Sequence, residues 1–181
     1  CNLRCQYCHM EGEEKPDGNS SKEMTTDEIE RVIDKIVDQA KAPTISFTGG
    51  EPTLRDDLPE LIAHAQKIGI VTGLVTNGRK LKDKEFVSTL EKAGLDFAQV
   101  TLESSDAEIH DQMTGSKGSW QETIQGIRNL IPTTIYTTTN TTLTKLNATS
   151  FPETMTFVHS LGVQAFGCNS LIHSGKGHSF A

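Results

Sequence analysis

Long apolar segments and clustered basic residues are both missing from this sequence. No run approaches the ~20 consecutive apolar residues of a membrane-spanning helix, so we expect no membrane partner. The 17 Lys and Arg residues are outnumbered by 24 Asp and Glu, and the formal net charge is −7. These bases are scattered along the chain, which argues against a nucleic-acid partner because phosphate binding depends on clustered positive charge. The hydrophobic content of 35% is typical of an ordinary globular domain.

Cysteines are too few for a disulfide scaffold, and they are unevenly placed. The sequence has four, and three of them lie close together at Cys1, Cys5 and Cys8. Such clustering is typical of metal binding by reduced thiols, so we expect a reducing compartment and a cytoplasmic location. The fourth, Cys168, lies in a segment with Phe, Gly and Val and is predicted to be a buried apolar thiol.

Helical and strand patterns alternate along the rest of the chain. The predicted strands are 44–48, 70–76, 97–102, 134–139 and 163–168. Apolar residues recur at helical spacing within 29–40, 58–68, 86–93, 124–131 and 155–161. This alternation predicts an α/β fold with right-handed crossovers and a parallel sheet. In such folds ligands bind at the carboxyl ends of the strands.

Capping-box patterns mark the predicted start of three helices. The pairs are Thr25 with Glu28, Ser119 with Glu122, and Ser150 with Glu153. In each pair the hydroxyl is expected to accept a hydrogen bond from the amide three residues later. The stretch 11–22, which contains Gly, Pro, Asn and Ser, is predicted to be a loop.

The cysteine cluster offers three thiolates from one short loop. Structural zinc usually takes four protein ligands, often as two separate pairs. A cubane iron–sulfur cluster is held by Cys thiolates, usually four. Three thiolates would leave one iron without a protein ligand and open for chemistry. The alternative is a non-catalytic zinc module, with the site completed by His9 or by a distant residue.

These cysteines and several strand-end segments together resemble the radical S-adenosylmethionine (SAM) superfamily. The motifs are Cys1-Asn-Leu-Arg-Cys5-Gln-Tyr-Cys8, Gly49-Gly50-Glu51-Pro52, Thr76-Asn77-Gly78 and Thr101-Leu102-Glu103. The likeness is greatest to SPASM-containing maturases and the molybdenum-cofactor protein A group. It implies a partial TIM barrel of the (β/α)6 type whose first strand is missing from this chain. It also implies that residues 1–181 are one catalytic domain, truncated at both ends.

The resemblance implies two cofactors and the residues that bind them. A [4Fe-4S] cluster would be held by Cys1, Cys5 and Cys8. The residues implied in binding SAM are Tyr7, Gly49, Gly50, Glu51, Pro52, Asn77, Glu103 and Asn140. Glu51 would bind the ammonium group of SAM, and Tyr7 would lie near its adenine. Glu103 would bind the ribose hydroxyls. Asn140, predicted to lie at the end of the strand 134–139, would assist it.

Each of these roles has a structural alternative. Glu51 and Asn77 also suit ordinary turns, and Tyr7 suits a core position. Glu103 could be a solvated carboxylate and Asn140 a loop cap. The superfamily often has Asp at the position of Glu103, so this chain keeps a carboxylate there on a longer side chain. It often has Arg at the position of Thr114, and the contact that such an Arg could make is not expected here.

The implied reaction is reductive cleavage of SAM to methionine and a 5′-deoxyadenosyl radical that abstracts hydrogen from a substrate. A ferredoxin or flavodoxin would supply the electron. Peptide maturation or cofactor biosynthesis is favoured for the unidentified substrate. The pair His110-Asp111 is interpreted as ordering a loop rather than as a catalytic pair. A cluster enzyme that does not use SAM is the second alternative.

Overall fold

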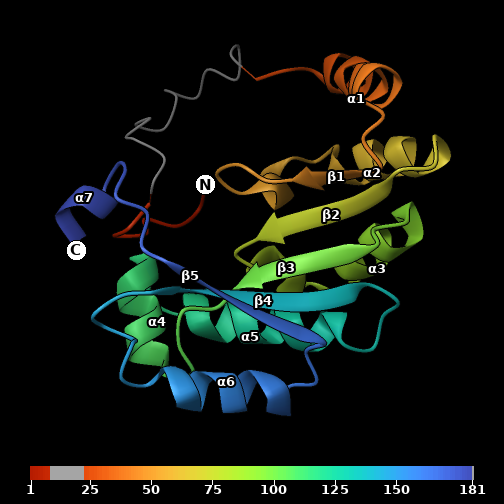
Figure 1. The fold of residues 1–181 in the computed structure, drawn as a ribbon. Helices are drawn as coiled ribbons and strands as arrows, with labels where there is room; N and C mark the ends of the chain where they lie inside the picture. The colour runs from red at the N-terminus through yellow and green to blue at the C-terminus, as the bar shows by residue number, and fades with distance from the viewer. Residues whose placement is uncertain (9–22, 181) are drawn as a thin grey trace.

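The computed structural model describes residues 1–8 and 23–180, which form a single parallel sheet flanked by helices (Figure 1). The strands are β1 (Thr44–Phe47), β2 (Val71–Thr76), β3 (Phe97–Thr101), β4 (Tyr136–Leu143) and β5 (Ala165–Ser170). Their order in the sheet is β1-β2-β3-β4-β5, and all neighbouring strands are parallel. The sheet formed by the described residues does not close on itself. The predicted α/β fold and partial barrel are therefore confirmed.

Helices connect the strands in the predicted alternation. They are α1 (Thr26–Ala40), α2 (Leu58–Lys67), α3 (Lys84–Ala93), α4 (Ala107–Thr114), α5 (Ser119–Leu130), α6 (Phe151–Ser160) and α7 (Gly177–Phe180), with 3₁₀ turns η2 (Pro52–Leu54) and η3 (Lys80–Lys82). Of these, α4 and α7 were not predicted, because short helices carry little periodic signal. The whole loop predicted for 11–22, and His9, lie outside the described residues. None of the helices in the described part of the chain is long and apolar enough to cross a bilayer.

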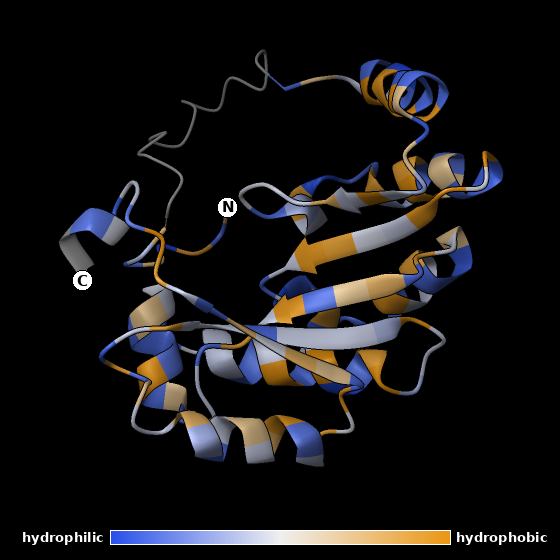
Figure 2. Cartoon of the chain, in the orientation of Figure 1, coloured by the Kyte–Doolittle hydropathy of each residue, from blue (hydrophilic) through white to orange (hydrophobic). Residues whose placement is uncertain are grey.

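The main core lies between the sheet and helices α2, α3 and α5. Leu74, Ala98 and Val100 of the sheet are fully buried against apolar side chains of these helices, including Leu90 and Ile127. Burial alternates along β3, as expected for a strand with one face packed on helices and the other open. Strand β4 is rich in threonine and is pale in Figure 2, whereas β2 carries strongly apolar segments. The core therefore depends mainly on the strands around β2 and β3.

The capping predictions are correct for one helix and wrong for two. Thr25 and Glu28 form the reciprocal capping box at the start of α1. The N-cap of α5 is Gly118 rather than Ser119, and no side-chain bond from Ser150 caps α6. At α5 the cap is supplied from α4 instead.

Asp111 of α4 is the group that caps α5. Its carboxylate accepts hydrogen bonds from the amides of Gly118 and Trp120 and from the Ser119 hydroxyl. A carboxylate is favoured at the positive N-terminal end of a helix, and here it replaces the predicted hydroxyl cap. Burial alone would raise the pKa of Asp111, but these hydrogen bonds outweigh it and the pKa lies below its usual value. These contacts support a structural role for Asp111.

Candidate functional site

The cysteine loop, residues 1–8, lies beyond the carboxyl ends of the strands. In Figure 1 its red trace lies on the side toward which the arrowheads of β2 and β3 point. The side-chain amide of Asn77, just after β2, donates a hydrogen bond from Nδ2 to Asn2 Oδ1 at 2.7 Å. Tyr7 reaches Glu103, two residues after β3, and Cys1 packs against Gly50 after β1. The fold thus gathers three strand ends around the cysteine loop.

The backbone of the cysteine loop is held by the C-terminal end of α4. The amides of Arg4 and Gln6 donate to the carbonyls of Thr114 and Met113, both at 3.0 Å. These carbonyls belong to the last turn of α4, where a helix leaves its acceptors without internal partners. Gly115 follows with φ of 63°, and a Cβ there would lie 2.5 Å from the Arg4 carbonyl oxygen. A side chain at this position would force the loop away from α4.

The three cysteines of the loop carry free thiols. Cys1 is exposed, whereas Cys5 and Cys8 are partly buried. Burial raises the pKa of Cys5 to about 11, and the nearby Glu103 carboxylate adds to the shift. Any metal bound there would have to displace the thiol proton.

The donor set of this loop is of the kind that iron–sulfur clusters take. Three free thiols match the ligand preference of such clusters. Among the described residues, no group of three or more His, Cys, Asp or Glu side chains is placed to hold one metal ion. His9, the ligand considered for the zinc alternative, lies outside those residues.

The segment after β1 contains two glycines, and Cys1 lies against the second of them. Gly49 has φ of 135°, in the region that favours glycine, and both glycines are exposed. A Cβ on Gly50 would lie 3.1 Å from Cys1 Cβ and 3.2 Å from the Cys1 nitrogen. The absence of a side chain at Gly50 therefore allows the close approach of Cys1. Pro52 is buried and begins η2.

Glu51 is buried, and its carboxylate is already bonded within the protein. Oε1 accepts hydrogen bonds from the Thr53 amide at 3.1 Å, the Thr53 hydroxyl at 2.7 Å and the Thr76 hydroxyl at 2.7 Å. Oε2 accepts one from the Asn77 amide at 2.8 Å. A carboxylate oxygen has two lone pairs, so Oε2 retains one acceptor position. Glu51 thus joins the ends of β1 and β2, and binding of an ammonium group stays a prediction.

Tyr7 and Glu103, predicted to contact adenine and ribose, contact each other. The Tyr7 hydroxyl donates to Glu103 Oε1, and the Thr142 amide donates to Oε2 at 2.8 Å. Glu103 is fully buried, and burial raises its pKa to about 7 although both hydrogen bonds lower it. Each carboxylate oxygen of Glu103 accepts one of these bonds and retains one acceptor position, and the ribose contact stays a prediction.

Two sequence-based predictions about position are wrong. Asn140 does not end its strand, because β4 continues to Leu143 and pairs with β5 along that extension. Asn140 instead pairs with Thr101 and Gly167 inside the sheet. Cys168 is exposed rather than buried, since β5 is the last strand of the sheet.

Several residues around the cysteine loop were missed by sequence reasoning. Asn2 and Arg79 bond each other through the Asn2 carbonyl, and Asn147 donates to the Glu103 carbonyl at 2.8 Å. Asn2 lies inside the cysteine motif and Arg79 directly follows Thr76-Asn77-Gly78. Their positions within or next to a recognised motif were therefore the signal that could have identified Asn2 and Arg79.

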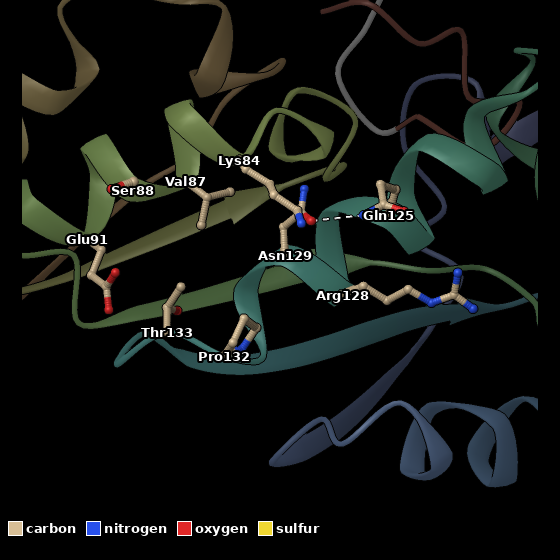
Figure 3. A pocket seen from close by; sticks show the side chains of 9 residues that line it. All are labelled: Lys84, Val87, Ser88, Glu91, Gln125, Arg128, Asn129, Pro132 and Thr133. Atoms are coloured by element: carbon tan, nitrogen blue, oxygen red, sulfur yellow. Dashed lines mark hydrogen bonds between the residues drawn. The ribbon is translucent and has the colours of Figure 1, made fainter.

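A cavity elsewhere in the molecule is separate from this site. It has a volume of about 320 Å³ and lies between α3 and α5 (Figure 3). Its lining residues are Lys84, Val87, Ser88, Glu91, Gln125, Arg128, Asn129, Pro132 and Thr133. In Figure 3 the Arg128 guanidinium points away from the other lining side chains. The lining contains none of the predicted site residues, and we assign the cavity no part in the site.

Comparison with protein families and curated sequences gives consistent matches. The family model described as the Radical SAM superfamily matches residues 1–158. The AdoMet-dependent heme synthase of Oleidesulfovibrio alaskensis is 30% identical over 176 residues, covering 97% of this chain and 44% of that protein. The probable GTP 3′,8-cyclase of Thermococcus kodakarensis is 36% identical over 131 residues, covering 72% of this chain and 40% of that protein.

Comparison with solved structures agrees on the fold. Streptococcus suis SuiB bound to its precursor peptide SuiA matches with a TM-score of 0.79 and 21% identity, covering 96% of this chain and 37% of that one. SuiB bound to S-adenosylmethionine has the same TM-score. Identity this low shows the shared fold alone. The present chain spans less than half the length of each of these relatives.

Proposed function

Because this chain belongs to the radical SAM superfamily, we propose that the full-length protein binds a [4Fe-4S] cluster on Cys1, Cys5 and Cys8 and cleaves SAM reductively. The observation that carries this proposal is the placement of the cysteine loop. It lies at the carboxyl ends of parallel strands, where such folds bind ligands, and Gly50 allows Cys1 to pack closely. The names of sequence relatives, including an AdoMet-dependent heme synthase, support SAM as the cosubstrate.

The cluster and SAM would supply the radical chemistry, in which one-electron reduction cleaves SAM and the resulting 5′-deoxyadenosyl radical abstracts hydrogen from a substrate. The described residues would bind and orient these groups. Gly49 has open space where a side chain would lie, and Glu51 Oε2 has one acceptor position for an ammonium group. Tyr7, Asn77 and Asn140 remain candidates for contacts with the nucleoside.

We favour cofactor biosynthesis over peptide maturation as the substrate class. The sequence relatives at 30% and 36% identity are named as a heme synthase and a GTP cyclase, both of which act on small molecules. The peptide-bound neighbour SuiB shares 21% identity and supports the fold alone. A ferredoxin or flavodoxin is the proposed electron donor.

The proposed chemistry is tested by measuring 5′-deoxyadenosine. The full-length protein would be reconstituted with iron and sulfide without oxygen, then given SAM and dithionite. We expect product from the wild type and from Cys168→Ala, since Cys168 is an exposed residue of β5 and is not one of the three loop cysteines. We expect none from Cys5→Ala. A wild type that carries the cluster but forms no product would favour a cluster enzyme that does not use SAM, and bound zinc would favour the structural module.

A further inference from the structure

Arg79, which lies just after β2, joins the cysteine loop to helix α5. It follows Asn77-Gly78 at the end of β2, and its side chain is 21% exposed. Its Nη1 donates to the Asn2 carbonyl oxygen at 2.7 Å, while its Nε pairs with the Glu122 carboxylate of α5. Arginine can make both bonds at once because its planar guanidinium presents donors in a fixed fork. One side chain therefore ties the loop to α5.

The position of Asn2 explains why this contact matters. Asn2 follows Cys1 directly and lies in the stretch that leads to Cys5. The later part of the loop has its own anchors, because the Arg4 and Gln6 amides bond the end of α4 and the Cys8 carbonyl accepts from the Lys176 amide. Asn2 accepts two hydrogen bonds. Its side-chain oxygen accepts one from the Asn77 side chain, and its backbone carbonyl accepts one from Arg79. Asn77 and Arg79 thus hold the chain at Asn2, next to Cys1, while the Arg4 amide holds it just before Cys5.

We propose that Arg79 is a positioning residue for the cluster, acting through Asn2 on the placement of Cys1. This inference rests on the proposed function, since it assumes that a cluster binds the loop. Residues that hold metal ligands in place typically change metal affinity by about 10–100-fold when they are altered. Arg79 meets the structural requirement for such a residue, because it bonds the backbone next to a ligand without being a ligand itself.

Lys82 provides a matched control for Arg79. It pairs with the other oxygen of the same Glu122 carboxylate, and its side chain is 53% exposed. Arg79→Gln and Lys82→Gln each remove one cation from Glu122, and the Asn2 bond is lost only in Arg79→Gln. If Arg79 only stabilised the fold through its ion pair with Glu122, the two substitutions would change the rate of cluster loss in the same way. Arg79→Lys keeps a cation for Glu122 but cannot reproduce the fork.

The test compares the rate at which these variants lose their cluster. Full-length proteins would be reconstituted anaerobically and given excess chelator, and the visible absorbance of the cluster would be followed. We expect loss about tenfold faster in Arg79→Gln than in wild type, with Lys82→Gln close to wild type. The paramagnetic resonance spectrum of the reduced cluster should change in Arg79→Gln and stay unchanged in Lys82→Gln.

The outcomes separate this inference from the proposed function. Equal rates in Arg79→Gln and Lys82→Gln, in proteins that hold the cluster, would overturn the role of Arg79 and leave the function standing. A wild type that takes up no cluster would overturn both. If Arg79→Gln does not fold, Arg79→Lys decides the question. Faster loss than in Lys82→Gln supports the role, and an equal rate overturns it.

Discussion

Glu103 and His110 both have buried titratable side chains, and the Glu103 backbone bonds the His110 ring. The Glu103 amide donates to His110 Nδ1 at 3.2 Å, so the neutral imidazole carries its proton on Nε2. That nitrogen is buried and has no hydrogen-bond partner among the described residues. Burial lowers the pKa of His110 to about 4, although the neighbouring Asp111 opposes the shift. The geometry supports a structural His110 that is kept neutral.

The first prediction concerns the pH dependence of stability through His110. Above pH 6.5, the usual pKa, His110 is neutral in both states. As the pH falls toward 4, the unfolded chain gains a proton that the folded protein does not take up, so stability falls. The expected loss is on the order of 3 kcal/mol across this window. Urea unfolding at several pH values would measure it.

The control for this prediction must account for Glu103. Its pKa is raised to about 7 from 4.5, so its contribution to stability is lost as the pH rises through the same range. The two groups therefore act in opposite directions. The prediction is that stability of wild type relative to His110→Gln decreases as the pH falls from 7 to 4. A constant difference between them would show that His110 titrates alike in both states.

The second prediction concerns the bond between Tyr7 and Glu103. Tyr7→Phe removes a donor from a buried carboxylate, and we expect the free energy of unfolding to fall by about 1–3 kcal/mol. Tyr136→Phe is the matched control, because Tyr136 is 49% exposed and should change little. Denaturant unfolding of both variants would show the contrast. Equal effects would mean that the Tyr7 hydroxyl contributes no net stability.

At the scale of elements, short-range sequence patterns predicted the strands and the main helices. The capping box of α1 depends only on residues three apart, and it was predicted correctly. The cap of α5 comes from Asp111, seven residues before Gly118, and a local pattern does not reveal it. Asn140 was misplaced because the extension of β4 depends on pairing with β5, a long-range contact. Local signals therefore succeeded at α1 but not at α6, where Ser150 makes no side-chain cap bond although Glu153 lies three residues later.

The third prediction tests the junction between α4 and the cysteine loop. Gly115 and Gly118 both have positive φ, at 63° and 83°, so alanine at either position brings backbone strain of about 1 kcal/mol. Only at Gly115 would the new Cβ meet the loop, 2.5 Å from the Arg4 carbonyl oxygen, while the space at Gly118 is open. We expect both variants to lose stability and only Gly115→Ala to bind less iron after reconstitution. Similar iron contents would argue against α4 as a support of the loop.

At the scale of the whole molecule, the parallel topology places distant motifs together. Crossovers return the chain to the same side, so the segments after β1, β2 and β3 meet the N-terminal loop although they are about 50 to 100 residues from it. The order of the motifs along the sequence predicted that these segments lie near the cysteine loop. It did not predict that Tyr7 and Glu103 would bond each other or that Arg79 would hold Asn2, because such contacts depend on loop conformation.

The most direct test of the account is paramagnetic resonance of the reduced full-length protein with and without SAM. We predict a cluster signal that SAM changes, because three thiols from the loop would leave one iron of the proposed cluster open to a ligand. That signal should be absent from Cys5→Ala and present in Cys168→Ala. A SAM-sensitive signal that persists in Cys5→Ala, or a reduced cluster that does not respond to SAM, would contradict it.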